Sequence, residues 1–114
     1  MDICFEGVGQ VAATFQADGK KTRPGMAVTL TGSGEVGLGK DGDELCGVVL
    51  GSVRGGAAAV QIGGAAKVGY TGGAPKAGWQ ELACDGTGCV KTGGGAKCLV
   101  LAVDESAKTV VVKL

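Results

Sequence analysis

Residues 44–68 read ELCGVVLGSVRGGAAAVQIGGAAKV and decide the fold class of this chain. Two apolar runs rich in β-branched residues flank a glycine turn at residues 54–56, and Gly63-Gly64 marks the next corner. Valine and isoleucine stiffen an extended backbone, and glycine supplies the positive φ angles of tight turns. The pattern predicts a β-meander with strands at residues 45–53, 57–62 and 65–70, because the runs are too short and too often broken by glycine for helices.

The bulk composition indicates one small, folded, all-β domain. The chain has 114 residues, of which 24 are Gly and 2 are Pro, and 45% of its residues are hydrophobic. This length suits a single domain with a modest core. Glycine at this density approaches disordered compositions, but the apolar residues here are gathered into runs of strand length. We therefore expect a glycine-rich β-barrel or sandwich.

The first 23 residues allow two interpretations. Both phenylalanines, Phe5 and Phe15, lie in this segment, with Val8 and Val11 between them. A protruding apolar arm is a common device for binding a partner. An ordinary first strand is the equally favoured alternative. Residues 24–114 would then form the single barrel or sandwich domain.

The remaining apolar runs predict further strands and an internal repeat. The expected strands cover residues 26–31, 35–38, 79–83, 97–103 and 108–114, with a short strand beginning at Val90. Residues 25–30, 32–36 and 46–60 resemble residues 78–83, 86–90 and 97–111, respectively. Each half would contain a strand, a glycine turn, a short strand, a loop and a long hairpin. Two such motifs closing on each other predict a barrel with pseudo-twofold symmetry.

Charge argues against a nucleic-acid partner. The chain carries 11 basic and 11 acidic residues, so its formal net charge is zero, and few of its residues are aromatic. A nucleic-acid-binding protein would show a basic excess and aromatic stacking platforms. The N-terminus lacks the pattern of a signal peptide, and no run approaches the length of a membrane span. We expect a soluble protein that is made in the cytoplasm.

The five cysteines are scattered, and the chain has no histidine. The cysteines are Cys4, Cys46, Cys84, Cys89 and Cys98. The spacing of Cys84 and Cys89 is too long for a zinc knuckle, and no histidine could complete one. Structural thiols in a reducing compartment are the simpler interpretation.

Two phosphate-binding patterns occur without their usual context. Residues 34–40 fit G-x-x-x-x-G-K, but Asp41 stands where a Ser or Thr would hold magnesium, and residues 32–37 fit G-x-G-x-x-G. Both patterns need a following helix, and a strand is expected here. Asp41, Asp43 and Glu44 lack the other ligands of a calcium loop. Without histidine, no Cys–His or Ser–His pair is available. We expect no enzyme activity, catalytic residue, cofactor or metal.

Tyr70 and Trp79 are the only tyrosine and tryptophan, and both lie beside expected loops. Packing in the core or at a corner is one interpretation, and use in an interface is the other. Lipoyl and biotinyl carrier domains are also small pseudo-twofold β-folds that present a lysine at a hairpin tip. The tips at residues 54–56 and 93–97 lack the usual sequence around such a lysine, so a carrier is the weaker alternative.

The chain as a whole resembles the small capsid cement, or head decoration, proteins of tailed phages and prophages. The similarity rests on the order of residues 45–50, 53–56, 59–64 and 70–72, on residues 82–88, 97–104 and 109–114, and on the start at residues 5–7 and 13–15. It covers nearly the whole sequence, and its motifs are patterns of apolar residues and glycines. Such proteins often carry an aromatic residue where Cys46, Ala65 and Cys98 stand here, so local packing would differ.

The resemblance implies a structural protein of the virion that binds the outside of the capsid shell and reinforces it, often as a homotrimer. Its partner would be the major capsid protein, with no role for nucleic acid or membrane. Candidate contact residues are the large apolar side chains of the N-terminal segment and the two single aromatics: Phe5, Val8, Val11, Phe15, Tyr70 and Trp79. The alternative is a β-barrel interaction module without catalytic activity.

Overall fold

The computed structural model describes residues 11–17, 22–53 and 56–114, with Ser52 and Val53 described by their backbone only. Every regular element in these ranges is a β-strand, which confirms the all-β prediction. In the first half the strands are β1 (Val11–Ala17), β2 (Ala27–Gly32), β3 (Glu35–Gly37), β4 (Gly47–Val53) and β5 (Ala57–Gly63). In the second half they are β6 (Ala65–Gly69), β7 (Gly78–Cys84), β8 (Val90–Thr92), β9 (Ala96–Asp104) and β10 (Thr109–Lys113).

The first five strands form a closed barrel in the order β1-β3-β2-β4-β5. β1 pairs antiparallel with β5 along its length and parallel with β3 at Gln16 and Ala17. Of the two interpretations of the N-terminal segment, a first strand therefore describes residues 11–17. The rest of that segment, apart from residues 22–23, lies outside the described residues.

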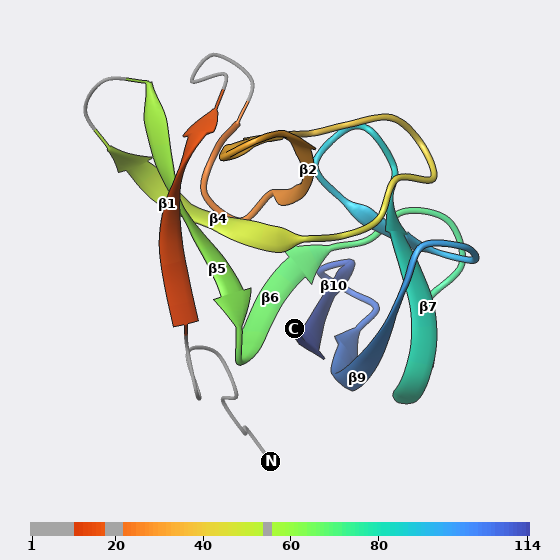
Figure 1. The fold of residues 1–114 in the computed structure, drawn as a ribbon. Helices are drawn as coiled ribbons and strands as arrows, with labels where there is room; N and C mark the ends of the chain where they lie inside the picture. Colours follow the sequence, from red (N-terminus) through yellow and green to blue (C-terminus); the bar gives the residue numbers. More distant parts are fainter. Residues whose placement is uncertain (1–10, 18–21, 54–55) are drawn as a thin grey trace.

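The last five strands form a second sheet in the order β6-β10-β9-β7-β8. A single parallel bridge between Tyr70 and Val90 brings its two edges together. Here the predicted meander is wrong in one respect, because β6 pairs with β10 and not with β5. The chain turns at Gly64, whose φ is +81°, and leaves the first barrel for the second sheet. Figure 1 shows the two halves side by side, with the C-terminus between them.

The two halves repeat one pairing pattern. The first half has the strand order β3-β2-β4-β5, and the second half has the equivalent order β8-β7-β9-β10. In the same way, β1 pairs with β5 and β6 pairs with β10. The parallel contact of Ala17 with Val36 matches that of Tyr70 with Val90. The amide of Ala17 donates to Gly56 O, and that of Tyr70 donates to Lys108 O, both at 3.0 Å. The predicted repeat is thus present in the strand pairing, and it also includes β1 and β6.

A bulge occurs at the same place in both long hairpins. Counting from the turn, three cross-strand pairs are followed by one unpaired residue, which is Leu50 in β4 and Leu101 in β9. An extra residue of this kind locally increases strand twist and bends the strand. Because the two bulges lie at equivalent positions, they fix which residues of the two halves correspond.

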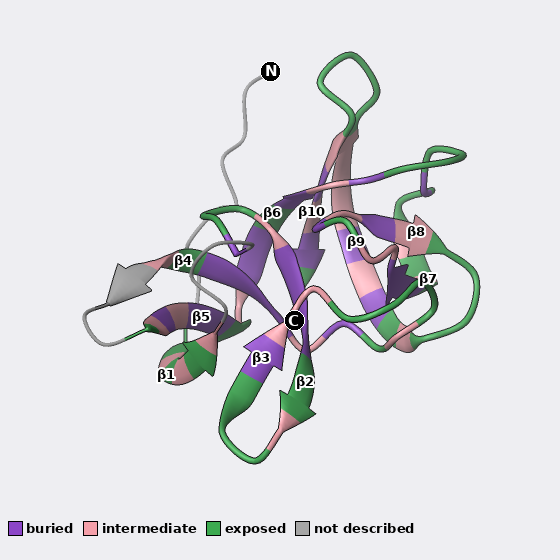
Figure 2. Ribbon diagram, turned by 90° about the horizontal axis from the view of Figure 1, so that it is seen from above, coloured by how far each residue is buried: buried purple, intermediate pink, exposed green. Residues whose placement is uncertain are grey.

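Two buried clusters form the core. Val28, Val36, Val49, Ala58 and Val60 fill the first barrel. The larger cluster fills the second half but also includes three residues of the first: Ala27, Leu45 and Val48. Figure 2 shows buried residues along β4, β6 and β10. The outer face of β2 and β4 therefore completes the core of the second half. Within the described ranges, no helix is long and apolar enough to cross a membrane.

Candidate interaction surfaces

The six predicted contact residues fall into different environments. Phe5 and Val8 lie outside the described residues. Val11 opens β1 and is 54% exposed, whereas Phe15 is half-buried against the core of the first barrel. Tyr70 is 5% exposed within the larger cluster, so its ring packs in the core and offers no contact surface. Trp79 is 60% exposed, the highest value among the large apolar side chains that the structure describes.

Trp79 lies on the outer face of the second sheet. It pairs with Leu99 on β9, which in turn pairs with Lys113 on β10. Residues directly opposite one another in a sheet project from the same face, so these three side chains form a row. The neighbouring pair on the same face is Glu81 with Lys97. A large exposed aromatic ring beside an aliphatic side chain is typical of an interface anchor.

A second surface is a pocket of about 520 Å³ between β1 and β3. Its lining includes the apolar side chains of Ala17, Val36 and Leu38 and the polar side chains of Gln16 and Glu35. Ala17 and Leu38 are partly buried against the first core, and Val36 belongs to it. The pocket therefore reaches the apolar interior of the first barrel.

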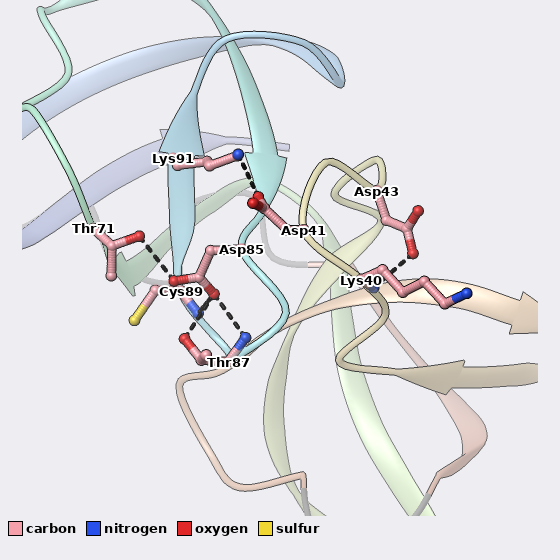
Figure 3. Close-up of polar contacts among 8 residues, drawn as sticks. All are labelled: Lys40, Asp41, Asp43, Thr71, Asp85, Thr87, Cys89 and Lys91. Atoms are coloured by element: carbon pink, nitrogen blue, oxygen red, sulfur yellow. Dashed lines mark hydrogen bonds and ion pairs between the residues drawn. The ribbon is translucent and has the colours of Figure 1, made fainter.

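A polar network stabilises the turn between β7 and β8, whose Gly86 borders this pocket (Figure 3). Oδ1 of Asp85 accepts hydrogen bonds from the backbone N–H and the hydroxyl of Thr87, both at 2.8 Å, and from the Cys89 amide at 3.2 Å. Oδ2 accepts one from the Thr71 hydroxyl at 2.8 Å. Partial burial acts to raise the pKa of Asp85, but these hydrogen bonds outweigh it and lower the pKa. An ion pair between Lys91 and Asp41 links β8 to the loop before β4.

The described cysteines are free thiols that serve packing. Burial first, and then the nearby Asp43, Cys46 and Asp85, raise the pKa of Cys84 to about 12. Such a thiol is protonated at neutral pH and is a poor nucleophile. Among the residues that the structure describes, no three His, Cys, Asp or Glu side chains come together as metal ligands.

Comparison with protein-family models and with curated proteins finds no match. The surfaces must therefore be interpreted from their own geometry. Sequence reasoning singled out Trp79 and Phe15 but missed Leu99, Lys113 and the β1–β3 pocket. The sequence does not show that Leu99 lies beside Trp79, because this depends on how β7, β9 and β10 pair.

Proposed function

We propose that this chain is a structural phage protein that binds the outside of a capsid shell, as a homotrimer, and stabilises the shell. Its partner is the major capsid protein, and its place is the surface of the virion. The proposal is supported first by the resemblance of nearly the whole sequence to capsid cement proteins. It is also supported by a small all-β fold built from two halves with the same strand pairing.

The observation that carries the proposal is the exposure of large apolar side chains on both halves of a chain with well-filled cores. Val11 in the first barrel is 54% exposed and Trp79 in the second sheet is 60% exposed. Large aromatic side chains such as Trp79 are enriched among the residues that anchor contacts with other proteins. One copy covering roughly 800 Å² of a partner would bind moderately. A trimer whose copies each touch the shell gains from multivalency, so a modest contact becomes a stable one.

The decisive test is quantitative mass spectrometry of purified particles from the source of this sequence. A copy number in the hundreds, near-stoichiometric with the major shell protein, supports the proposal. Absence from particles, with the protein left soluble in the lysate, contradicts it and favours the alternative of an interaction module without a shell partner.

A truncation separates shell binding from folding. Removing residues 1–15 would delete most of β1, which is part of the closed barrel, so the arm is tested by removing residues 1–10. We expect this variant to keep the circular dichroism spectrum of the full chain and to bind shells more weakly. A lost β spectrum would instead show that these residues belong to the fold.

A further inference from the structure

Two equivalent rows of side chains cross the two halves. Val48 lies two residues before the bulged Leu50, and Leu99 lies two residues before the bulged Leu101. Reading across the neighbouring strands from each residue gives one row per half. The inner row is Ala27, Val48 and Gln61. The outer row is Trp79, Leu99 and Lys113.

The inner row is covered by the second half of the same chain. Its three residues are 0%, 3% and 2% exposed. The Ala27 amide donates to Gly88 O at 2.8 Å, and the Gln61 side-chain amide donates to Ala65 O at 2.8 Å. Ala27 and Val48 belong to the core cluster of the second half. The outer row has no such cover in the described chain, since Trp79 and Lys113 are exposed and Leu99 is half-buried.

The surface that receives the inner row also has an equivalent. The second half contributes the inward-facing residues of β6 and the residue after it, Ala66, Val68 and Tyr70, all at most 5% exposed. The pairing of β1 with β5 matches the pairing of β6 with β10, so the residues of β1 that correspond to these three are Ala13, Phe15 and Ala17. These counterparts are all only half-buried, and Ala17 lines the β1–β3 pocket.

We propose that a second copy of this chain covers the outer row with its β1–β3 pocket, repeating between molecules the contact that joins the two halves within one molecule. Side-chain sizes fit this exchange. Inside the chain, the small Ala27 shares a cluster with the large Tyr70. Between chains, the large Trp79 meets the small Ala17, beside a pocket able to take an indole ring.

Charge is also complementary across the proposed contact. Lys97 and Lys113 stand on the face that carries Trp79 and outnumber Glu81 there. Glu35 lines the pocket, is exposed, and pairs with Gln16. Rim charges of opposite sign favour the correct partner and orientation more than they add affinity.

The contact joins two different surfaces, so it is heterologous. Head-to-tail contacts of this kind close into rings when the rotation allows and otherwise form filaments. A ring of three such contacts would be the homotrimer proposed above. The inference concerns contacts between copies alone and holds whether or not the partner shell is a capsid.

The test mixes two variants that each damage one surface. Trp79→Glu removes the anchor but keeps the pocket, and Ala17→Glu blocks the pocket but keeps the anchor. We expect the unmodified chain to be oligomeric by native mass spectrometry, without shells present, and each variant alone to be monomeric. Loss of a central tryptophan typically weakens such a contact by about 30-fold or more. An equimolar mixture should give a 1:1 dimer of twice the 11.1 kDa chain mass and nothing larger.

The controls separate this result from misfolding and from a symmetric interface. Leu50→Glu changes another exposed apolar side chain, 39% exposed, that neither lines the pocket nor lies in the outer row, and it should leave the oligomer intact. If Ala17→Glu does not fold, Gln16→Trp takes its place in the mixture, because a bulky ring at this exposed, pocket-lining position also blocks the pocket. A monomeric unmodified chain at high concentration, an oligomeric Trp79→Glu, or a mixture without dimer would each overturn the proposal. Shell binding with any of these outcomes would leave the proposed capsid role standing, although a monomeric chain would contradict the homotrimer.

Discussion

The hydroxyl of Thr71 donates a 2.8 Å hydrogen bond to the carboxylate of Asp85, and so ties the segment after β6 to the turn between β7 and β8. The two residues are 14 positions apart. With Thr87 and Cys89 they hold that turn in place, while Cys84 just before it exchanges backbone hydrogen bonds with Gly42 and Asp43 of the first half. A single carboxylate therefore organises the region where the two halves meet.

Asp85 should make stability depend on acidity. Its hydrogen bonds lower the pKa in the folded state relative to the ordinary value of about 3.9. The contribution of Asp85 to stability is therefore fully present above the ordinary pKa. It is lost as the pH falls through the lower pKa of the folded state. Asp85→Asn should cost about 1–2 kcal/mol at neutral pH, because weaker acceptors replace the carboxylate. It should also lose less stability than the unmodified chain between neutral pH and pH 2, as measured by urea unfolding.

Glu105→Gln, in the exposed turn between β9 and β10, is the control for this experiment. It should leave the acid dependence close to that of the unmodified chain. An Asp85→Asn variant with unchanged stability and unchanged acid dependence would show that the network adds nothing to folding.

Val48→Ala should weaken the second half although Val48 lies in the first barrel. Val48 is 3% exposed within the larger core cluster. Truncating a buried valine leaves a cavity and should cost about 2 kcal/mol. We expect hydrogen exchange, followed by mass spectrometry, to become faster in β9 and β10. Val111→Ala, at a half-buried position on the outer face of the second sheet, should change exchange much less. Exchange in β9 and β10 that stays unaffected by Val48→Ala would mean that the halves are stable independently.

The strands could be predicted from the sequence because their signals are local. Alternation of apolar residues and turns at glycine placed most strands within one or two residues of where they lie. The repeat could be predicted too, since the spacing of Gly-rich turns is similar in both halves. Residues 11–17 were harder, because three of the seven are alanine and their pairing with β5 depends on distant sequence.

The surfaces could not be predicted because they depend on pairing between distant residues. Tyr70 and Trp79 look alike in sequence, as single aromatics beside glycine-rich loops. The pairing of β6 with β10, together with cover from the first half, buries Tyr70, whereas the pairing of Trp79 with Leu99 turns its ring outward. The partner of β6 was mistaken for the same reason, since neither strand carries a local signal for the other.

Gly95→Ala should be far more destabilising than Gly94→Ala. Both glycines have positive φ, +89° and +69°, where alanine costs about 1–2 kcal/mol. A Cβ at Gly95 would also stand 2.5 Å from the Leu82 carbonyl oxygen and 2.8 Å from the Ala83 Cβ, whereas at Gly94 nothing lies within 4 Å. We expect a total cost of about 3 kcal/mol or more at Gly95 and only the backbone term at Gly94. Urea unfolding measures both, and equal losses would show that the β8–β9 turn can relax.

Cys84 should resist alkylation until the chain unfolds. Its side chain is fully buried, and its pKa of about 12 leaves almost no thiolate at pH 8. Cys89 lies five residues away and is half-buried, so it serves as the internal reference. We expect iodoacetamide at pH 8 to label Cys89 slowly and Cys84 only at the rate of global unfolding, as read from labelled peptides by mass spectrometry. In urea the two should react at similar rates, because unfolding returns both thiols to water. Equal labelling of the folded chain would mean that the strand end at Cys84 opens locally, and that the contact between the two halves is looser than its hydrogen bonds to Gly42 and Asp43 indicate.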